Sequence, residues 1–334
     1  MQVLIIGGTG LISTGITRTL VADGHEVACF TRGNSEAAVP DAVTFVEGDR
    51  DEDADLDRAV SDVEPDVVID MVCFDPDQAR AAVDVCGGRI DQYVFCSTVD
   101  VYHRPVARAP ITEDAPRSPP VSDYGAGKAA AEDVFMAAHG DAFATTIIRP
   151  WSTYGEGGTI NHTFGNGTYY LDRLRQGKPI VVHGDGTSMW AACHRDDVAV
   201  AFANAVGNPA AYGEAYHVTA EEHMTWNQYH RTVARAIDAP EPTFVHIPTE
   251  LLRTVAPERT GMLEAHFQYS TVFDNGKARR DLDFRYTIPL EEGVRRTVSH
   301  LERTVGIDDC DSADDDRIID AWATATAAFR DRLA

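Results

Sequence analysis

The sequence predicts an α/β fold in which a doubly wound parallel sheet is joined by a smaller C-terminal lobe. Apolar runs rich in Val, Ile and Phe alternate with helix-like segments over the first 150 residues, and a glycine turn joins the first run to the first helix. Near-continuous apolar strands separated by helices are typical of parallel sheets that are buried on both faces. With 334 residues, of which 44% are hydrophobic, the chain is long enough to bury a large core.

The elements of this sheet follow one another in a regular order. Strands are predicted at residues 3–6, 26–30, 43–49, 66–72, 92–98 and 144–150. Helices are predicted between and before them at residues 14–23, 53–62, 76–87 and 125–139. A helix at 196–206 and a strand at 214–218 have the same character, so we expect them to extend the same sheet.

Beyond Pro150 the pattern loosens into glycine-rich and aromatic segments. We therefore predict two domains, the first formed by residues 1–155 with a contribution from 195–220. The second is the smaller lobe, formed by residues 156–194 and 221–334, with a helix near 290–304.

The chain is strongly acidic, with a formal charge of -24 and only three lysines among its 29 basic residues. Because the acids are spread over the whole length, we favour a surface adapted to high salt over an acidic interaction face. Such a surface repels phosphate backbones, so no nucleic-acid partner is expected. The acidic run at 308–316 is expected to be a solvated linker, and 317–334 a terminal amphipathic helix.

The six cysteines show neither a CxxC pair nor metal-ligand spacing. They are expected to be reduced core residues, which indicates a cytoplasmic protein without a metal site. No signal peptide is visible, and no apolar run approaches the roughly 20 residues of a membrane helix. We therefore expect no membrane association.

The stretch "LIIGGTGLIS" predicts a dinucleotide site. Gly7 permits a tight turn after the first strand, and Gly10 lets the backbone approach a pyrophosphate that faces the helix N-terminus. Thr9, Leu11 and Ile12 complete this expected cofactor contact. The third glycine of the usual spacing is Ser13, so the helix must pack with a hydroxymethyl group at that position.

The end of the second strand bears on the choice between NAD and NADP. Thr31 and Arg32 occupy the place where an acid holds the ribose diol of NAD. A guanidinium there can pair with a 2′-phosphate, which favours NADP slightly over NAD, although Arg32 could also stack on adenine or simply be exposed. Asp49 and Arg50, after the third strand, are expected at the rim of the adenine pocket.

Three residues predict the reactive centre. Tyr124 and Lys128 are four residues apart, hence on one face of a helix, and Thr98 ends a strand upstream. A phenol ionises near pH 10, but a nearby ammonium and a cationic nicotinamide both favour the phenolate. We therefore expect Tyr124 to be the base, Lys128 to lower its pKa and contact ribose hydroxyls, and Thr98 to bind the reacting oxygen.

On these motifs the chain resembles the extended short-chain dehydrogenase/reductase superfamily, and within it the NAD-dependent epimerase/dehydratase family that acts on sugars. The resemblance covers about residues 1–220 and rests on the motifs GGTGLIS, GDR, VFCSTVDVY, YGAGK, IRPWSTYG and VVHGDGTSMWAACHRDDVA. It implies a Rossmann domain and a Tyr124/Lys128/Thr98 triad. It also implies that the cofactor site includes Val72, Ser97 and Pro150, with Tyr102 nearby. The acidity is similar to that of haloarchaeal proteins.

Two departures from the family narrow the chemistry. Where sugar dehydratases carry an Asp-Glu pair after the strand-end threonine, this chain has Val99 and Asp100, so elimination of water is less expected. Asp100 remains an auxiliary base, or a solvated loop residue. Where relatives that bind nucleotide-sugars have a diphosphate-binding arginine, this chain has Trp190, which argues against a nucleotide substrate unless Arg173, Arg175 or Arg195 compensates.

The sequence therefore predicts an NAD(P)-dependent epimerase or oxidoreductase that acts on a sugar or sugar derivative. Trp151, Ser152 and Trp190 are candidate substrate contacts together with Asp100. The alternatives are a sugar dehydratase and a non-catalytic nucleotide- or RNA-binding relative, such as the chloroplast stem-loop-binding proteins. A homodimer is expected, formed through the small-residue face of the helix at 125–139.

Overall fold

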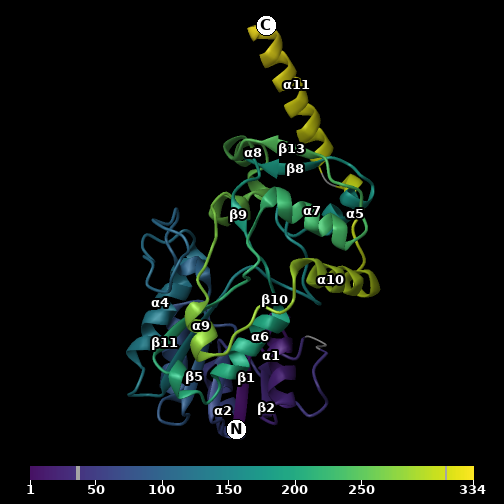
Figure 1. The fold of residues 1–334 in the computed structure, drawn as a ribbon. Helices are drawn as coiled ribbons and strands as arrows, with labels where there is room; N and C mark the ends of the chain where they lie inside the picture. Colours follow the sequence, from purple (N-terminus) through teal and green to yellow (C-terminus); the bar gives the residue numbers. More distant parts are fainter. Residues whose placement is uncertain (35–37, 313) are drawn as a thin grey trace. The chain divides into compact units, whose positions relative to one another are not determined.

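The computed structural model describes residues 1–34, 38–312 and 314–334 (Figure 1). The chain divides into two compact units, each assembled from three segments. Unit 1 comprises Met1–Thr153, Ala192–Glu221 and Phe273–Thr287. Unit 2 comprises Tyr154–Ala191, Glu222–Val272 and Ile288–Ala334.

Unit 1 contains a seven-stranded sheet in the order β11-β6-β5-β4-β1-β2-β3, and every neighbouring pair is parallel. Its strands are β1 (Gln2–Ile6), β2 (Glu26–Thr31), β3 (Thr44–Glu47), β4 (Val67–Asp70), β5 (Gln92–Cys96), β6 (Ala144–Pro150) and β11 (Glu214–Val218). The chain adds strands on one side of β1 and then on the other. The predicted doubly wound sheet is thus confirmed, with its topological switch point between β1 and β4.

Helices cover both faces of this sheet. They are α1 (Leu11–Ala22), α2 (Asp53–Val63), α3 (Pro76–Cys86), α4 (Asp123–Ala137), α6 (Arg195–Ala205) and the short α9 (Gly276–Asp281), with 3-10 turns at Val99–Val101 and Pro209–Ala211. Side chains of α2, α3 and α4 form one core with Leu4, Phe30 and Phe95 of the strands. On the other face α1 packs against α6, where a Cβ on Gly15 would lie 3.0 Å from that of Ala199.

Unit 2 is built from short elements around an aromatic interior. Its helices are α5 (Tyr169–Arg175), α7 (Trp226–Ala236), α8 (Thr249–Val255), α10 (Leu290–Thr304) and α11 (Asp315–Leu333), with short turns at Pro257–Arg259, Leu263–Phe267 and Cys310–Ser312. The parallel strands β8 (Ile180–His183) and β13 (Phe244–Ile247) pair, as do the antiparallel β9 (Met189–Trp190) and β12 (Met224–Thr225). The two-residue strands β7 (Thr153–Tyr154) and β10 (Cys193–His194) lie where the chain passes between units.

The segment Phe273–Thr287 belongs to unit 1 and not, as predicted, to the C-terminal lobe. Side-chain contacts explain its place. Asn275 donates to the carbonyl of Thr219 at 2.8 Å, and the carbonyl of Leu282 accepts from Asn204 at 2.8 Å. These bonds hold the segment beside β11 and α6.

The acidic run at 308–316 is not simply a solvated linker, which corrects the expectation from its composition. Asp315 is buried and forms an ion pair with Arg259 at 2.5 Å. Asp316 is paired with Arg173, and Asp311 with Lys178. The run is therefore attached to unit 2 by arginine and lysine partners that a local sequence pattern cannot identify.

All six cysteines are free and buried. None of the helices in the described parts of the chain is both long and apolar enough to cross a membrane.

Candidate functional site

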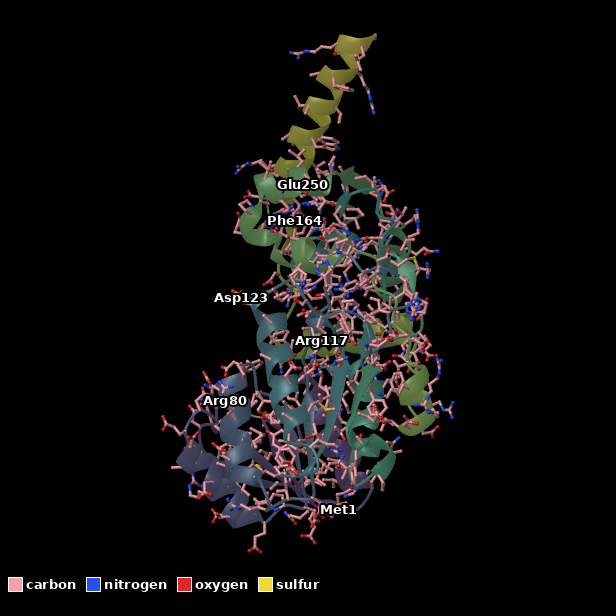
Figure 2. The ribbon with its side chains drawn as sticks, turned by 90° about the vertical axis from the view of Figure 1, so that its left-hand side faces the viewer. Met1, Arg80, Arg117, Asp123, Phe164 and Glu250 are labelled. Atoms are coloured by element: carbon pink, nitrogen blue, oxygen red, sulfur yellow. The ribbon has the colours of Figure 1, made fainter. Side chains whose placement is uncertain are left out.

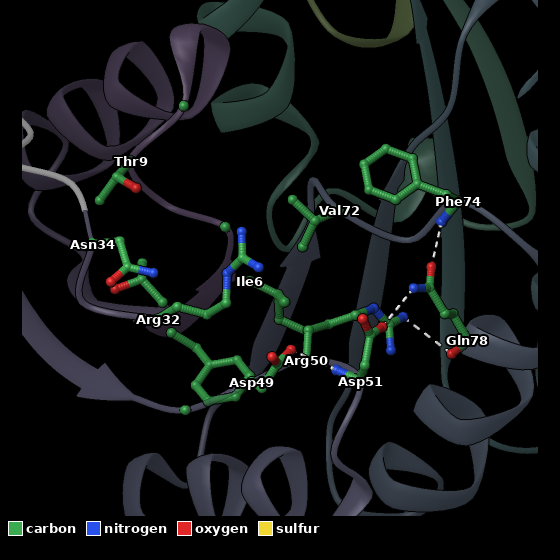
Figure 3. Close-up of a pocket in the computed structure, with 15 residues that line it drawn as sticks. Ile6, Thr9, Arg32, Asn34, Asp49, Arg50, Asp51, Val72, Phe74 and Gln78 are labelled. Carbon is green, nitrogen blue, oxygen red and sulfur yellow. Dashed lines mark hydrogen bonds between the residues drawn. The ribbon is translucent and has the colours of Figure 1, made fainter.

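A pocket of about 360 Å³ opens at the carboxyl ends of β1 to β4 in unit 1 (Figure 3). This is the switch point of the sheet, where doubly wound folds bind their ligands. The predicted cofactor residues that line it are Gly7, Thr9, Gly10, Thr31, Arg32, Asp49, Arg50 and Val72. Asn34, Asp51, Phe74 and Gln78 also line it and were not predicted.

The glycine turn is shaped by close contacts with its neighbours. Gly7 has a φ of +81°, and a Cβ there would lie 2.7 Å from Val72 Cγ1. A Cβ on Gly8 would lie 2.3 Å from Cys29 Sγ. Only glycine therefore fits at these two positions, and the backbone is left open to a ligand on its pocket side.

Ser13 stabilises this turn, which explains how the chain accommodates a serine in place of the third glycine. Its hydroxyl donates to the Gly7 carbonyl at 2.7 Å and accepts from the Gly10 amide at 2.8 Å. The first turn of α1 starts at Leu11, followed by Ile12, and carries no acidic residue. The helix N-terminus can therefore receive a pyrophosphate without competition from a carboxylate.

Arg32 and Arg50 differ in their surroundings although both line the pocket. Arg32 is exposed, and no hydrogen bond or ion pair to it is found among the described residues. Arg50 is buried and donates to Asp70 and to the Gln78 carbonyl, both at 3.0 Å. Figure 3 shows Arg50 directed toward Gln78 and Arg32 at the opposite side of the pocket. Arg50 therefore supports the pocket wall, whereas Arg32 is available to a ligand.

The three residues of the predicted reactive centre come together at the end of β5. Tyr124 and Lys128 lie on α4, whose N-terminus is capped by the Ser122 hydroxyl at 3.0 Å from the Gly125 amide. Lys128 is almost fully buried and donates to the Cys96 carbonyl at 2.7 Å. Thr98 is hydrogen-bonded to Tyr124.

Phe74 connects this centre to the pocket. It lines the pocket, and its ring centroid lies 6.4 Å from that of Tyr124 and 4.8 Å from Lys128 Nζ. The dinucleotide-type pocket and the reactive centre are therefore contiguous within unit 1.

The pKa values of this centre differ from the prediction. Desolvation of its hydroxyl raises the pKa of Tyr124, although 45% of the whole side chain is exposed. Cys96 and Asp100 raise it further, and only the hydrogen bond with Thr98 lowers it. Burial also lowers the pKa of Lys128. The Lys128 ammonium is directed at the Cys96 carbonyl, and its charge does not outweigh the desolvation that raises the pKa of the phenol.

Asp100 lies in the 3-10 turn after Thr98, and its amide donates to the Thr98 hydroxyl at 3.2 Å. Burial raises the pKa of Asp100 to about 6, and Arg104 acts against that rise. Asp100 is therefore a partly desolvated carboxyl beside the reactive centre and not a solvated loop residue.

The glycines of YGAGK bring α4 against this turn. A Cβ on Gly125 would lie 2.2 Å from the Asp100 carbonyl, and one on Gly127 would lie 2.3 Å from the Phe74 carbonyl. Because Gly125 and Gly127 have no side chains, α4 can lie directly against the backbone at Asp100 and at Phe74.

A buried network lies behind the centre, and of its members Ser97 and Tyr102 were predicted near the site whereas Glu132 and His217 were not. Ser97 donates to Glu132 at 2.5 Å, and Arg149 pairs with the same carboxylate at 2.6 and 2.7 Å. Arg149 also donates to the Tyr102 hydroxyl, which lies 2.6 Å from His217 Nε2. The spacing of Glu132, four residues after Lys128 and on the same helix face, was the available signal.

The tautomer of His217 follows from its contacts. Its Nδ1 lies 3.1 Å from the Asp274 carbonyl, so Nδ1 carries the proton and Nε2 accepts from Tyr102. Burial, followed by Arg149, lowers the pKa of His217 to about 3. This neutral imidazole keeps the network in one arrangement.

A surface residue adds to this network from outside α4. Arg117 donates to Glu132 at 3.0 Å, to Asp133 at 2.6 Å and to the Ala129 carbonyl at 3.3 Å. Figure 2 labels Arg117, and it also labels Asp123, the first residue of α4. The outer face of α4 is thereby partly covered.

The predicted substrate contacts are dispersed. Pro150 ends β6, followed by the buried Trp151, which packs 6.2 Å from the Phe273 ring, and by Ser152, whose φ of +42° is rare for a residue with a side chain. Trp190 belongs to unit 2, where it is fully buried against Trp226 and Phe267, with ring centroids at 4.7 and 4.9 Å. It is a core residue.

Residues 3–219 match the model of the NAD dependent epimerase/dehydratase family. The chain is 30% identical to the 2'-dehydrokanamycin reductase of Streptomyces kanamyceticus, over 83% of this chain and 77% of that protein. It is 28% identical to the chloroplast stem-loop binding protein of 41 kDa b of Arabidopsis thaliana, over 88% and 77%.

A solved structure has the same fold. The UDP-glucuronic acid 4-epimerase of Bacillus cereus, in complex with NAD, superposes with a TM-score of 0.71 at 18% identity, covering 91% of this chain and 99% of that one.

Proposed function

Because this chain belongs to the NAD-dependent epimerase/dehydratase family, we propose that it is an NAD(P)-dependent oxidoreductase or epimerase acting on a sugar or sugar derivative. The observation that supports this best is the contiguity of the glycine-turn pocket with Thr98, Tyr124 and Lys128, which Phe74 joins. The free buried cysteines support a cytoplasmic location.

The residues of the pocket fit such a cofactor. The Gly7 turn leaves backbone open, and the first turn of α1 carries no acid that would repel a pyrophosphate. Gly7, Thr9, Gly10 and Val72 would hold the pyrophosphate end, with Arg32 at the ribose. A bound nicotinamide supplies the hydride acceptor or donor and a positive charge when oxidised.

Each residue of the reactive centre has a defined role in this proposal. Tyr124, as phenolate, accepts the substrate's hydroxyl proton while the neighbouring carbon loses hydride. Thr98 donates a hydrogen bond to the same oxygen. Lys128 fixes the end of β5 through the Cys96 carbonyl and adds positive charge beside the phenol.

Asp100 is proposed as a second acid–base group. Its pKa of about 6 lets it hold or release a proton near neutrality, and its charge is felt at Tyr124. An oxidised substrate that turns over and receives the hydride back on its other face gives epimerisation, and one that leaves gives net oxidation.

We propose NADP as the preferred cofactor on the basis of Arg32. It is exposed at the end of β2, where an acid would hold the diol of NAD. Dissociation constants for NADP and NAD, measured by fluorescence titration, test this. Arg32→Ala should weaken NADP binding about tenfold or more and leave NAD unchanged, because the lost contact is with the 2′-phosphate. Equal losses for both cofactors would contradict the preference.

We further propose that the substrate carries no nucleotide diphosphate. Trp190 occupies the place of the usual arginine and lies in the core of unit 2. Arg173 is buried, donates to the Pro179 carbonyl at 2.6 Å and pairs with Asp316, while Arg175 pairs with Glu302 at 2.6 Å. Arg195 is buried and donates to Thr14 Oγ1 at 3.2 Å, so none of the three arginines is set aside for a diphosphate. The relative from Streptomyces kanamyceticus is named as a reductase of 2'-dehydrokanamycin, and no nucleotide is part of that substrate name.

The decisive experiment is native mass spectrometry of the isolated protein, followed by a screen of sugars and amino sugars with the cofactor it retains. Retained NAD or NADP and turnover of a free sugar support the proposal. Turnover of nucleotide-sugars alone would contradict the absence of a diphosphate site.

A second candidate function is a non-catalytic RNA-binding protein, because one relative is a stem-loop binding protein. The formal charge of -24 weighs against RNA binding, because an acidic surface repels phosphate groups. The presence of Thr98, Tyr124 and Lys128 together at the end of β5 also favours an enzyme. Tyr124→Phe separates the two functions, since it removes turnover but would leave RNA binding intact.

A further inference from the structure

Lys128 is a buried charge with few polar partners. Its side chain is 1% exposed, and its ammonium carries three N–H donors. In the part of the chain that the structure describes, one hydrogen bond to this ammonium is found, with the Cys96 carbonyl at 2.7 Å, and no ion pair. Because removing a charge from water is costly, such an ammonium needs another source of stabilisation.

Aromatic rings provide it. Lys128 Nζ lies 4.8 Å from the ring centroid of Phe74, 4.9 Å from that of Phe95 and 5.9 Å from that of Tyr124. All three distances are within the range of about 6 Å over which the face of a ring attracts a cation, and this attraction is stronger where water is excluded. We call these three rings the Lys128 cage.

Phe74 differs from the other two rings of the cage because it also faces the pocket. Phe95 is fully buried in β5, and Tyr124 belongs to the reactive centre itself. Phe74 is 46% exposed and lines the pocket, whereas Lys128 is not one of the lining residues. The Phe74 ring is therefore the side of the cage that separates the ammonium from the pocket.

The backbone of Phe74 is held from two directions. Its amide donates to Gln78 Oε1 on α3 at 2.6 Å, a bond drawn in Figure 3, and Gln78 Nε2 donates in turn to Asp51 at 2.6 Å. On the other side, a Cβ on Gly127 of α4 would lie 2.3 Å from the Phe74 carbonyl. The place of the ring is thus set by α3 and α4 and not by its short loop alone.

We propose that Phe74 is a positioning residue, whose ring covers the Lys128 ammonium on the pocket side and keeps it free of water beside Tyr124. This role rests on the proposed function, in which Lys128 adds positive charge beside the phenol. A charge acts more strongly through a region without water. An aliphatic side chain would also exclude water, but it would offer the cation no ring face.

The protonation of Lys128 depends on the same contact. Burial is the main cause that lowers the pKa of Lys128. The groups that act against it come from β5, from β4 and the loop that follows it, and from α4, and they are Cys96, Asp70, Cys73 and Glu132. Substitution of Phe74 by a small residue leaves these groups in place and admits water. It should therefore raise the pKa of Lys128 toward its ordinary value.

The test observes Lys128 directly, because the chain has only three lysines. Protein made with lysine labelled with carbon-13 at Cε gives three side-chain signals, which Lys178→Arg and Lys277→Arg assign. In the free parent protein we expect the Lys128 signal to be shifted upfield by the rings of the cage. We also expect it to titrate at a lower pH than the other two signals.

Substitutions of Phe74 separate the ring from its bulk. Phe74→Ala should move the Lys128 signal downfield, raise the pKa of Lys128 by about one pH unit and lower kcat about tenfold or more. Phe74→Tyr keeps the ring and should restore the parent values. Phe74→Leu keeps the site covered, so it should lose part of the upfield shift without the rise in pKa. Phe45→Ala, at a phenylalanine of β3 that is 53% exposed, is the matched control and should leave Lys128 unchanged.

The spectra are recorded without substrate, so they distinguish this proposal from the proposed function. A Lys128 signal without an upfield shift in the parent protein, or one that Phe74→Ala leaves unchanged in position and pKa, would overturn the role of Phe74. Equal effects of Phe74→Ala and Phe45→Ala would do the same. A protein that shows the expected spectra but turns over no sugar would instead contradict the proposed function.

Discussion

Tyr124 and Lys128 face the same strand end but have different surroundings. The tyrosine is half exposed, whereas the lysine is buried and held by the Cys96 carbonyl. The chemistry of these two residues could be predicted from their spacing alone. The pKa of the phenol could not, because its rise comes from desolvation and from Cys96 and Asp100, which only the folded chain brings together.

This difference predicts distinct effects of two substitutions. Tyr124→Phe should lower kcat by about 10²–10⁴-fold and leave the melting temperature unchanged, because it removes a proton acceptor from a half-exposed ring. Lys128→Met should lower both, since the Cys96 carbonyl loses a buried donor. Turnover assays and calorimetry on both variants check this. An active Tyr124→Phe enzyme would exclude the phenol as the base.

Asp100 gives a prediction about pH. With a pKa of about 6, its carboxylate form is lost as the pH falls through 6, and activity should fall with it if the carboxylate is the working form. Asp100→Asn should lower kcat and remove that limb from the pH profile of kcat. A profile that keeps the limb in the variant would assign it to another group.

Several residues of the site could not be predicted in their actual roles. Arg50 was expected at the adenine rim, but its guanidinium is held by Asp70 and Gln78 within the wall. Ser13 departs from the glycine pattern because its hydroxyl bridges Gly7 and Gly10. Such roles depend on partners that are distant in sequence or on backbone geometry, which a motif does not record.

At the scale of elements, the strands were the most predictable features. The predicted strands at 144–150 and 214–218 coincide with β6 and β11. In β6 the run of Thr and Ile is typical of a buried parallel strand. Helix α1 starts at Leu11, earlier than predicted, since the glycine turn leads directly into it. The place of Phe273–Thr287 was unpredictable because it depends on Asn275 and Leu282 contacts.

The close approach of α4 to the turn at Asp100 gives a prediction about an element. Gly125→Ala places a Cβ about 2.2 Å from a carbonyl oxygen, so α4 must shift. We expect a loss of about 1–3 kcal/mol in the free energy of unfolding and a lower kcat. Gly261→Ala, where no atom lies within 4 Å, is the control and should leave both values unchanged. Denaturant titration and turnover measure the two effects, and an undisturbed Gly125→Ala protein would contradict this packing.

At the scale of the whole molecule, the family and the fold were predicted from the motifs and are confirmed by the family match and the sheet order. The interior of unit 2 was not predicted. It holds His162, His183 and His230, whose aromatic neighbours are spread over several elements. A lone histidine in the sequence gives no indication of such burial.

These histidines predict a loss of stability in acid. Burial lowers the pKa of His162 to about 3 and that of His183 to about 4, and lowers that of His230 as well. A depressed histidine pKa means that the unfolded chain binds the proton first as the pH falls below about 6.5. Each such histidine therefore costs about 1.4 kcal/mol per pH unit between pH 6.5 and its folded pKa.

Urea titrations at pH 7 and pH 5 measure this effect. The free energy of unfolding should be several kcal/mol lower at pH 5, and His183→Gln should reduce the difference. The raised pKa of Asp100 contributes with the opposite sign, because a protonated carboxyl is favoured in the folded state below about pH 6. An unfolding free energy that is the same at both pH values would contradict the burial of neutral imidazoles.

The return of the chain to unit 1 at Phe273 has a consequence for biosynthesis. Lys277 pairs with Glu214 of β11, and Asn275 binds Thr219, yet the whole stretch Glu222–Val272 of unit 2 is translated between these partners. During translation, unit 1 therefore cannot be completed until Thr287 has emerged from the ribosomal exit tunnel. A chain that stops before Phe273 would lack the partners of Glu214 and Thr219 at the edge strand β11, and we expect such a chain to misassemble more readily.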